Sequence, residues 1–363
     1  MHDINVEYWK DYDGLQRAKH NILRRYLGGW FPILSSWSGR VLYIDCNAGR
    51  GKHDTGEDGS PIIALKCLIN HNLRNKILNK SEVSFLFFEN NELNANILQS
   101  EINQLGQLPE KISCSLMCDD YQKQLSERLD SLEKTGGKLS PTLAFIDPYG
   151  YSISMELLNH LLSFKHCELF INFMYRYVDM AMHDKSKASN MDELFGTYLW
   201  QELLDIEDAD ERLSKTIRLF SDQLHAGYVT PIVMRGERNQ PKYVLIHASN
   251  ALKARETMKE AIWSAIPDGS FTAYERDNPG QLVLLTPEPE LRPLEDIIWK
   301  NFHGRSVRME EIYEVVDSTL YLRKHIHKIL KNYLDKNRVT AKGYTGRFAF
   351  SNNPIIEFPT ELF

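Results

Sequence analysis

Carboxylates follow short apolar runs at several points in the first half of the sequence. They are Asp45 after 41–44, Glu89 after 84–88, Asp119 and Asp120 after 113–118, and Asp147 after 142–146. Carboxylates accept hydrogen bonds from hydroxyl and amine groups and attract cations. Each of these acids could simply cap the helix that follows, which is a common role for Asp. Four of them in consecutive units instead favour a shared binding site.

A glycine-containing loop follows the first run. Asp45 is followed by Asn47, Ala48, Gly49 and Gly51, and glycine permits tight turns and a close approach of the backbone to a ligand. The spacing differs from the phosphate-binding Gly-x-x-x-x-Gly-Lys loop and from the three-glycine dinucleotide fingerprint. An acid just before the glycines disfavours a pyrophosphate. S-adenosylmethionine is a cation without phosphates, so we expect these residues to bind it.

The next two strand ends complete the predicted cofactor site. Glu89, followed by Asn90, is placed to accept hydrogen bonds from both ribose hydroxyls, like the acid that follows a dinucleotide loop. Asp119 or Asp120 is expected to accept a hydrogen bond from the adenine amine. The five cysteines are scattered and contain no second closely spaced pair, so a zinc site is not expected.

The segment Asp147-Pro148-Tyr149 at the fourth strand end carries the predicted catalytic residues. It resembles the Asp-Pro-Pro-Tyr signature of amine-methylating enzymes, with only one proline. In that chemistry the Asp side chain and a proline carbonyl accept hydrogen bonds from an exocyclic amine, and the aromatic ring stacks on an extruded base. The alternative is that these residues form an ordinary strand-to-helix turn.

Alternating strands and helices must position these groups. The runs have no polar face, and helical patterns separate them at 61–71, 92–105, 121–132 and 154–164. Strands of this kind are typical of a parallel sheet covered on both faces. We therefore predict an α/β fold with a doubly wound, Rossmann-like sheet that binds its ligand at the carboxyl ends of the strands.

The predicted first domain spans residues 1–267. One or two helices precede the first strand, 178–227 looks helical, and strands at 228–234 and 243–247 form an antiparallel hairpin that closes the sheet. Lys19 and His20 on the N-terminal helix either line the cleft or belong to a polar face, and we favour the polar face. His53, in the loop after Gly51, is either a catalytic acid or base or a solvated loop residue, and we favour the solvated one. Arg176 lies between two tyrosines, a combination that suits a nucleotide substrate, and the alternative is an Arg that is simply exposed on a helix.

The remaining residues, 268–363, are predicted to form a C-terminal winged-helix domain. Helical patterns at 294–302, 309–316 and 322–334 precede two short strands within 338–350. Between Tyr321 and Phe350 eight Lys or Arg residues accompany a single acid. The residues expected to contact nucleic acid are Arg323, Lys324, Lys328, Lys331, Lys342 and Arg347. A protein–protein module is the alternative.

Composition sets limits on these expectations. The chain has 363 residues with 43 Lys+Arg and 49 Asp+Glu, a net charge of −6 that argues against coating nucleic acid through bulk charge. No apolar run approaches the roughly 18 residues that span a bilayer, and the first residues do not resemble an export signal. Scattered cysteines without a disulfide framework fit a cytoplasmic protein.

Several motifs together resemble a known family, the three-Cys-motif partner proteins of bacteria. The matching segments are 43–51, 58–65, 87–90, 145–150 and 243–247, with Met258, Lys259 and Trp263, so the resemblance covers most of residues 1–267. It implies a fold like that of class I methyltransferases and a partner protein of radical S-adenosylmethionine type. The sequence departs from the family at Asn47, where an aromatic residue is common, and at Arg50, where a proline is common. Arg50 beside a sulfonium implies either an anionic ligand or an outward-pointing side chain.

Two hypotheses follow for the function. The first is an S-adenosylmethionine-dependent methyltransferase that modifies an exocyclic base amine in nucleic acid and works with the three-Cys-motif partner. The second is a non-catalytic subunit that binds a nucleotide or S-adenosylmethionine and recognises the substrate within a two-protein modification, repair or defence complex. The single proline after Asp147 modestly favours the second hypothesis.

Overall fold

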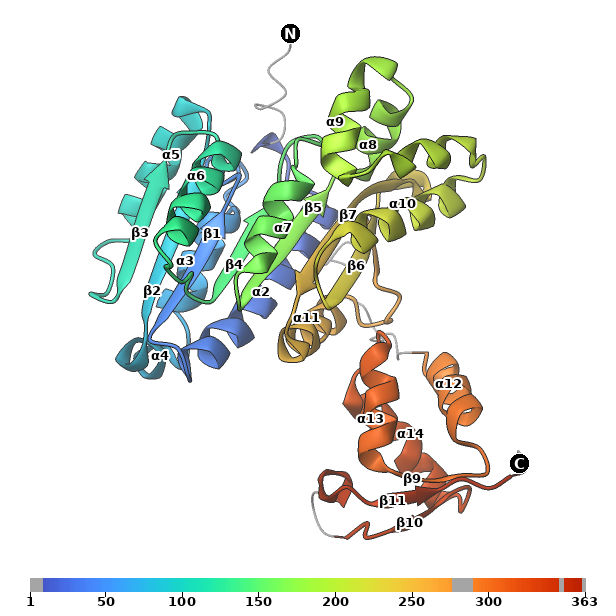
Figure 1. Cartoon of the computed structure of the whole chain (residues 1–363). Helices are drawn as coiled ribbons and strands as arrows, with labels where there is room; N and C mark the ends of the chain where they lie inside the picture. Colours follow the sequence, from blue (N-terminus) through green and yellow to red (C-terminus); the bar gives the residue numbers. More distant parts are fainter. Residues whose placement is uncertain (1–8, 276–289, 346–348, 361–363) are drawn as a thin grey trace. The chain divides into compact units, whose positions relative to one another are not determined.

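The computed structural model describes residues 9–275, 290–345 and 349–360, which fall into two compact units (Figure 1). The first unit holds the described residues up to Ala261 and a short strand at 272–274. The second holds Ile262–Phe271 and the described residues from Glu290 onward. The sequence-based boundary at 267 lies within the Ile262–Phe271 segment.

An eight-stranded sheet with the order β3-β2-β1-β4-β5-β7-β6-β8 forms the centre of the first unit. Its strands are β1 Arg40–Asp45, β2 Glu82–Phe88, β3 Ile112–Met117, β4 Thr142–Ile146, β5 Cys167–Phe173, β6 Tyr228–Arg235, β7 Pro241–Ser249 and β8 Thr272–Tyr274. Strands β1 to β5 are parallel, and β7 is antiparallel to both β5 and β6. The doubly wound sheet and its antiparallel hairpin are confirmed. The sequence did not indicate β8, which pairs with β6.

Helices connect the strands. They are α2 Gly14–Ser35, α3 Ser60–Ile69, α4 Arg74–Lys80, α5 Glu92–Gln104, α6 Tyr121–Lys134, α7 Met155–Ser163, α8 Tyr175–Met182, α9 Ala188–Phe195, α10 Ala209–Gln223 and α11 Leu252–Ala265, with 3₁₀ turns at Lys185–Lys187, Tyr198–Asp205 and Glu237–Asn239. Local sequence explains several helix starts, because the side chains of Asp13, Asn91 and Ser154 each accept a backbone N–H of the first turn. Among the described residues of the predicted N-terminal helical region, Trp9 and Lys10 are helical and α2 follows, continuing through Pro32.

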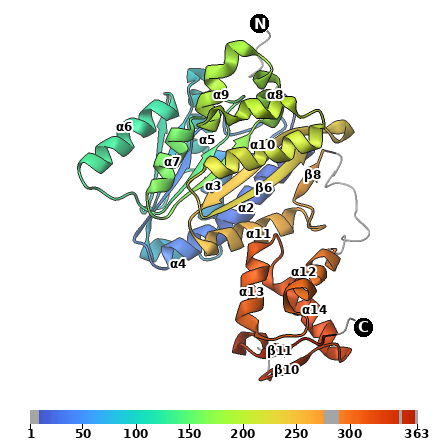
Figure 2. The ribbon, with the colours of Figure 1, turned by 45° about the vertical axis from the view of Figure 1, so that its right-hand side comes forward.

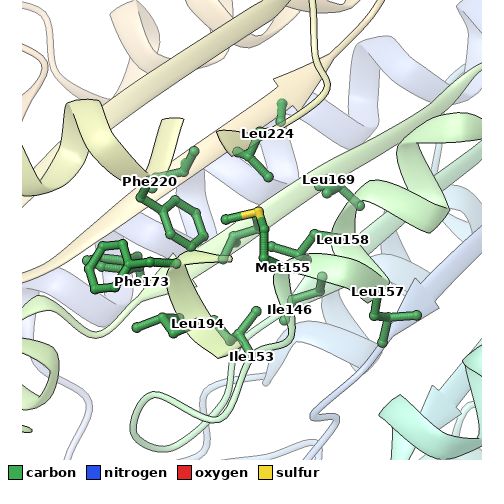
Figure 3. Close-up of a cluster of buried hydrophobic side chains, with 14 of the residues drawn as sticks. Ile146, Ile153, Met155, Leu157, Leu158, Leu169, Phe173, Leu194, Phe220 and Leu224 are labelled. Atoms are coloured by element: carbon green, nitrogen blue, oxygen red, sulfur yellow. The ribbon is translucent and has the colours of Figure 1, made fainter. Parts of the chain in front are cut away.

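Alternate residues of each central strand pack on opposite faces of the sheet. On β5, Leu169, Ile171 and Phe173 join a cluster with α7 and α10 (Figure 3). Phe170 lies on the other face, against Phe145. Figure 2 shows α7 and α10 on the face opposite α2. Both faces are therefore apolar, which is why the strands read as continuous hydrophobic runs.

The strand order reverses between β1 and β4. The chain moves outward from β1 to β2 and β3, then returns to β4 on the other side of β1. In doubly wound sheets this arrangement opens a crevice at the carboxyl ends of the two strands, where ligands bind. The loop after β1 and the Asp147 segment after β4 both lie at this switch point.

The second unit has three helices and a small antiparallel sheet of order β10-β11-β9. Its elements are α12 Arg292–Phe302, β9 Ser306–Arg308, α13 Met309–Ser318, α14 Arg323–Asp335, β10 Thr340–Lys342, a 3₁₀ turn at Ala349–Asn352, and β11 Ile355–Glu357. We expected both hairpin strands within 338–350. That placement is wrong for the second strand: β10 pairs with β11, because Ile356 and Phe358 enter the core of this unit. Arg347 lies outside the described residues.

Candidate active site

A cavity of about 610 Å³ opens at the switch point of the sheet. Its walls come from the loops after β1 to β5, from the start of α2 and from the start of β7. Ten predicted site residues line it: Asn47, Ala48, Gly49, Glu89, Asn90, Asp119, Asp120, Asp147, Pro148 and Tyr149. The topology thus brings together groups that lie up to a hundred positions apart in the sequence.

Glu89 joins two of the loops. Its Oε2 accepts the N–H of Gly49 at 2.8 Å, and its Oε1 accepts the N–H of Asn91 at 2.8 Å. Gly49 adopts φ +63°, and a Cβ at this position would lie 2.3 Å from the ring of Trp9. The loop therefore needs glycine for its backbone conformation and for its contact with Trp9.

Two residues predicted to bind the cofactor, Asp45 and Gly51, lie behind the cavity wall instead. Asp45 is fully buried and accepts the backbone N–H of Asn47 at 3.3 Å. Burial raises the pKa of its carboxyl group to about 7. Gly51, with φ +78°, packs against Leu98. Both residues support the loop from the protein interior and do not line the cavity.

Helix capping explains one of the strand-end acids. Asp120 caps α6 by accepting the N–H of Lys123 at 3.0 Å. Asp119 accepts a hydrogen bond from the Gln124 side chain at 2.7 Å, and both carboxylates are exposed at the cavity. The helices that follow Glu89 and Asp147, α5 and α7, are capped by Asn91 and Ser154. Helix capping therefore does not explain why Glu89 and Asp147 stand at the strand ends.

Asp147 is held by two buried side chains. Its Oδ2 forms an ion pair with Lys19 from α2, and its Oδ1 accepts the Nδ2 of Asn172, at the end of β5, at 2.5 Å. Lys19 is 2% exposed, and Lys19 and His20 both line the cavity. The polar-face interpretation of these two residues is wrong. A signal was present in the sequence, because Lys19 falls on the apolar stripe of α2 with Leu15 and Ile22.

The N-terminal segment contributes further residues that the sequence analysis missed. Trp9 lines the cavity, and its ring lies 4.9 Å from that of His53, which is buried rather than solvated. Tyr12 is hydrogen-bonded to His20 at 3.0 Å. Burial holds the pKa of His20 well below its usual value, so His20 is neutral at pH 7. Trp9 and His53 are distant in sequence, and no motif marks either contact.

Aromatic side chains stand at the mouth of the cavity. Tyr149 is 56% exposed, its hydroxyl lies 2.8 Å from that of Tyr177 on α8, and the two rings are 5.5 Å apart. Arg176 is exposed and also lines the cavity. This group provides apolar ring surface and positive charge next to Asp147.

The cavity carries a negative charge. Among the described residues that line it, six are Asp or Glu and three are Lys or Arg, which gives −3 with the histidines neutral. Arg50 is not in the lining: its Nε donates to Asn94 at 3.0 Å and its guanidinium lies over Trp9. The structure thus favours the outward-pointing alternative for Arg50, and the cavity suits a cationic ligand.

Five of the residues expected to contact nucleic acid are described in the second unit. Lys324, Lys328 and Lys331 are exposed at helical spacing on α14. Arg323 and Lys342 form ion pairs with Asp317 and Glu357, respectively. Both acids lie outside residues 321–350, so the positive charge of that segment is partly neutralised by neighbours in the fold.

Within residues 9–275, 290–345 and 349–360 no helix is long and apolar enough to cross a membrane. In the same ranges, no group of three or more His, Cys, Asp or Glu side chains is arranged to hold a metal ion.

Comparisons with known proteins give only distant structural likenesses. No protein-family model and no curated protein matches the chain. A Legionella pneumophila protein is similar at 11% identity and a TM-score of 0.40, covering 67% of this chain and 91% of that one. Trm1 from Pyrococcus horikoshii with S-adenosylmethionine has 11% identity and a TM-score of 0.37, covering 68% and 59%. An O-methyltransferase from Bacillus cereus with S-adenosylhomocysteine has 12% identity and a TM-score of 0.34, and the match covers 69% of this chain and 92% of that one. Likenesses this distant assign neither a family nor an activity to the chain.

Proposed function

We propose that the chain is an S-adenosylmethionine-dependent methyltransferase that modifies an exocyclic base amine of nucleic acid. The observation that carries the proposal is the acidic cavity at the switch point, with Glu89 on one side and Asp147 on the other. One end suits a cationic nucleoside, and the other presents the Asp-Pro-Tyr sequence.

The cofactor would occupy the side of the cavity formed after β1, β2 and β3. Glu89 has two oxygens anchored by backbone N–H groups, and its remaining lone pairs suit the two ribose hydroxyls. Asp119 and Asp120 are exposed near the adenine end. A net charge of −3 stabilises a sulfonium cation, and a cavity of about 610 Å³ has the size of a typical small-molecule site.

Asp147 would position the acceptor amine. Lys19 and Asn172 fix the orientation of its carboxylate, and the remaining lone pairs are available to an amine N–H. Tyr149 offers an exposed ring on which a base can stack. When bound, S-adenosylmethionine supplies an electrophilic methyl group. The contribution of the chain is to hold the amine nitrogen in place and to exclude water.

The second unit would bind the nucleic-acid backbone as a winged helix. Its order of elements is helix, strand, helix, helix, strand, strand, and Lys324, Lys328 and Lys331 lie on one face of α14. A recognition helix of this kind enters a groove while basic side chains contact phosphates. Binding through such contacts falls steeply with salt.

Isothermal titration with S-adenosylmethionine tests the cofactor site. We expect the wild type to bind, and Glu89→Ala to weaken binding about tenfold or more, because hydrogen bonds to a charged group contribute about 1.5–3 kcal/mol. Glu82→Ala is the matched control: Glu82 lies at the other end of β2, exposed and paired with Arg40. Absence of binding to the wild type would reject the proposed cofactor.

Transfer of a labelled methyl group to mixed DNA and RNA tests the catalytic proposal. Asp147→Ala should lose transfer by two orders of magnitude or more while retaining S-adenosylmethionine. The alternative is a recognition subunit that acts with a three-Cys-motif protein of radical S-adenosylmethionine type. That alternative predicts cofactor binding without transfer, and indifference of nucleic-acid binding to Asp147→Ala.

A further inference from the structure

The side chain of Asn172 has a defined orientation beside Asp147. Its Nδ2 lies 2.5 Å from Asp147 Oδ1 and 3.4 Å from the sulfur of Met174. A carboxylate accepts hydrogen bonds and donates none when ionised, so the nitrogen of the carboxamide must be the atom that faces it. The oxygen of Asn172 therefore lies on the other side of the amide group.

That oxygen lacks a partner. Asn172 is 3% exposed and lies in the cavity wall, and its Oδ1 has no hydrogen-bond donor among the residues that the structure describes. A buried acceptor without a donor costs about 1–3 kcal/mol, and native proteins retain few of them. Because Asn172 lines the cavity beside Asp147, a bound ligand can supply the missing donor.

Two acceptors in adjacent positions match one kind of donor. Asp147 offers carboxylate lone pairs, and Asn172 offers one carboxamide oxygen that is already oriented by its bond to Asp147. A primary amine carries two N–H groups on one nitrogen, whereas a hydroxyl or a monomethylated amine carries only one. Pro148 also lines the cavity, and its backbone carbonyl is the other candidate acceptor. Replacement of the Asn172 side chain leaves that carbonyl in place, so variants at Asn172 distinguish the two acceptors.

We propose that Asn172 is a specificity-determining residue, whose Oδ1 accepts the second N–H of a primary exocyclic amine while Asp147 accepts the first. The inference rests on the proposed function, and it specifies that the amine receiving the methyl group is a primary amine. On transfer, the amine nitrogen would bond to the methyl carbon, the sulfonium S–C bond would break to leave a neutral thioether, and one amine proton would pass to Asp147 or to water. The product keeps a single N–H, so it fits the pair of acceptors less well than the substrate does. The chain then transfers a single methyl group to each amine.

The test compares two single-stranded oligonucleotides that differ at one base. One carries adenine and the other N6-methyladenine, with a parallel pair carrying cytosine and N4-methylcytosine. The measured quantity is the ratio of kcat/KM for the primary amine to that for the monomethylated amine, with labelled S-adenosylmethionine as donor. We expect a ratio of about ten or more for the wild type, the effect of one buried hydrogen bond.

Two variants separate hydrogen bonding from bulk. Asn172→Leu keeps the size of the side chain and removes its polar atoms, whereas Asn172→Ala also makes room for an extra methyl group. Both should bring the ratio close to one. If Asn172 only holds Asp147 in place, both substrates slow equally and the ratio persists. Asn159→Ala is the matched control. Asn159 lies on α7 outside the cavity lining, and its carboxamide is hydrogen-bonded to backbone atoms of Gln223 and His225.

The outcomes are distinct. Equal kcat/KM for the two amines in the wild type overturns the role of Asn172 and leaves the proposed function standing, and this measurement does not depend on the folding of a variant. A ratio that survives Asn172→Leu and disappears only in Asn172→Ala assigns the selectivity to bulk and also overturns the proposal. Absence of methyl transfer in the wild type removes the proposed function and this inference with it.

Discussion

At the scale of single residues, the site depends on charges placed out of water. Lys19 reaches Asp147 from α2, and the pair is almost completely buried. A buried ion pair contributes little net stability, but removal of one partner leaves the other charge uncompensated. The pair therefore fixes the geometry of Asp147 more than it stabilises the fold.

Lys19→Met tests this role. We expect the free energy of unfolding to fall by about 3 kcal/mol, because the Asp147 carboxylate loses its counter-charge in a buried site. Methyl transfer should fall as well. Urea denaturation measures the first effect. Lys66→Met is the control, since its pair with Asp58 is half exposed and such pairs contribute about 0–1 kcal/mol. Equal losses in the two variants would contradict the assignment.

Asp45 makes stability depend on pH. Burial raises the pKa of its carboxyl to about 7 in the folded chain, above the usual 3.8. The folded state thus holds the proton more tightly than the unfolded state, and this contribution is complete below pH 4 and is lost as the pH rises through about 7. The loss approaches about 4 kcal/mol for a shift of three units.

Asp45→Asn removes the titrating group. Urea midpoints measured between pH 4 and pH 8 should decline less steeply in the variant than in the wild type. The same slope in both proteins would show that other groups cause the decline.

At the scale of elements, the loop after β1 adopts a conformation that other residues resist. Gly49→Ala places a Cβ against Trp9 at a positive φ, so we expect a loss of about 1–3 kcal/mol and weaker cofactor binding. Gly39→Ala is the control, because Gly39 has no atom within 4 Å of an added Cβ and precedes β1 outside the site. Thermal unfolding and titration measure the two effects. A harmless Gly49→Ala would show that the loop tolerates a side chain.

Elements differed in how well the sequence predicted them. The strands β1, β2, β4 and β5 are continuous apolar runs bounded by helical patterns, and parallel sheets covered on both faces produce that signal. The three-residue strand β11 has too few residues for a pattern. It forms because Ile356 and Phe358 complete the core of the second unit.

At the scale of the whole molecule, negative charge lines the cavity of the first unit and positive charge is exposed on a helix of the second unit. The cavity lining is acidic, whereas α14 presents exposed lysines. We expect Lys324→Ala combined with Lys328→Ala to weaken the binding of a nucleic-acid duplex and to reduce the slope of log K against log salt by about two. Fluorescence anisotropy at several salt concentrations measures this.

The control removes the same charge elsewhere. Lys76 and Lys80 are exposed on α4 at the same spacing, and their double replacement by Ala should leave the slope unchanged. If the two double variants behave alike, α14 makes no special contact with phosphates.

The sequence by itself determined the strand-ending acids, the glycine loop and the alternation that makes a doubly wound sheet, because these are local signals along the chain. Only the tertiary structure decided which of those acids face the cavity. Asp45 turned out to lie behind the wall, whereas Lys19 and Asn172 lie beside Asp147. Side-chain direction and partners depend on how α2, β4 and β5 pack. Lys19 and Asn172 lie 128 and 25 positions from Asp147, and no local pattern in the sequence links either of them to it.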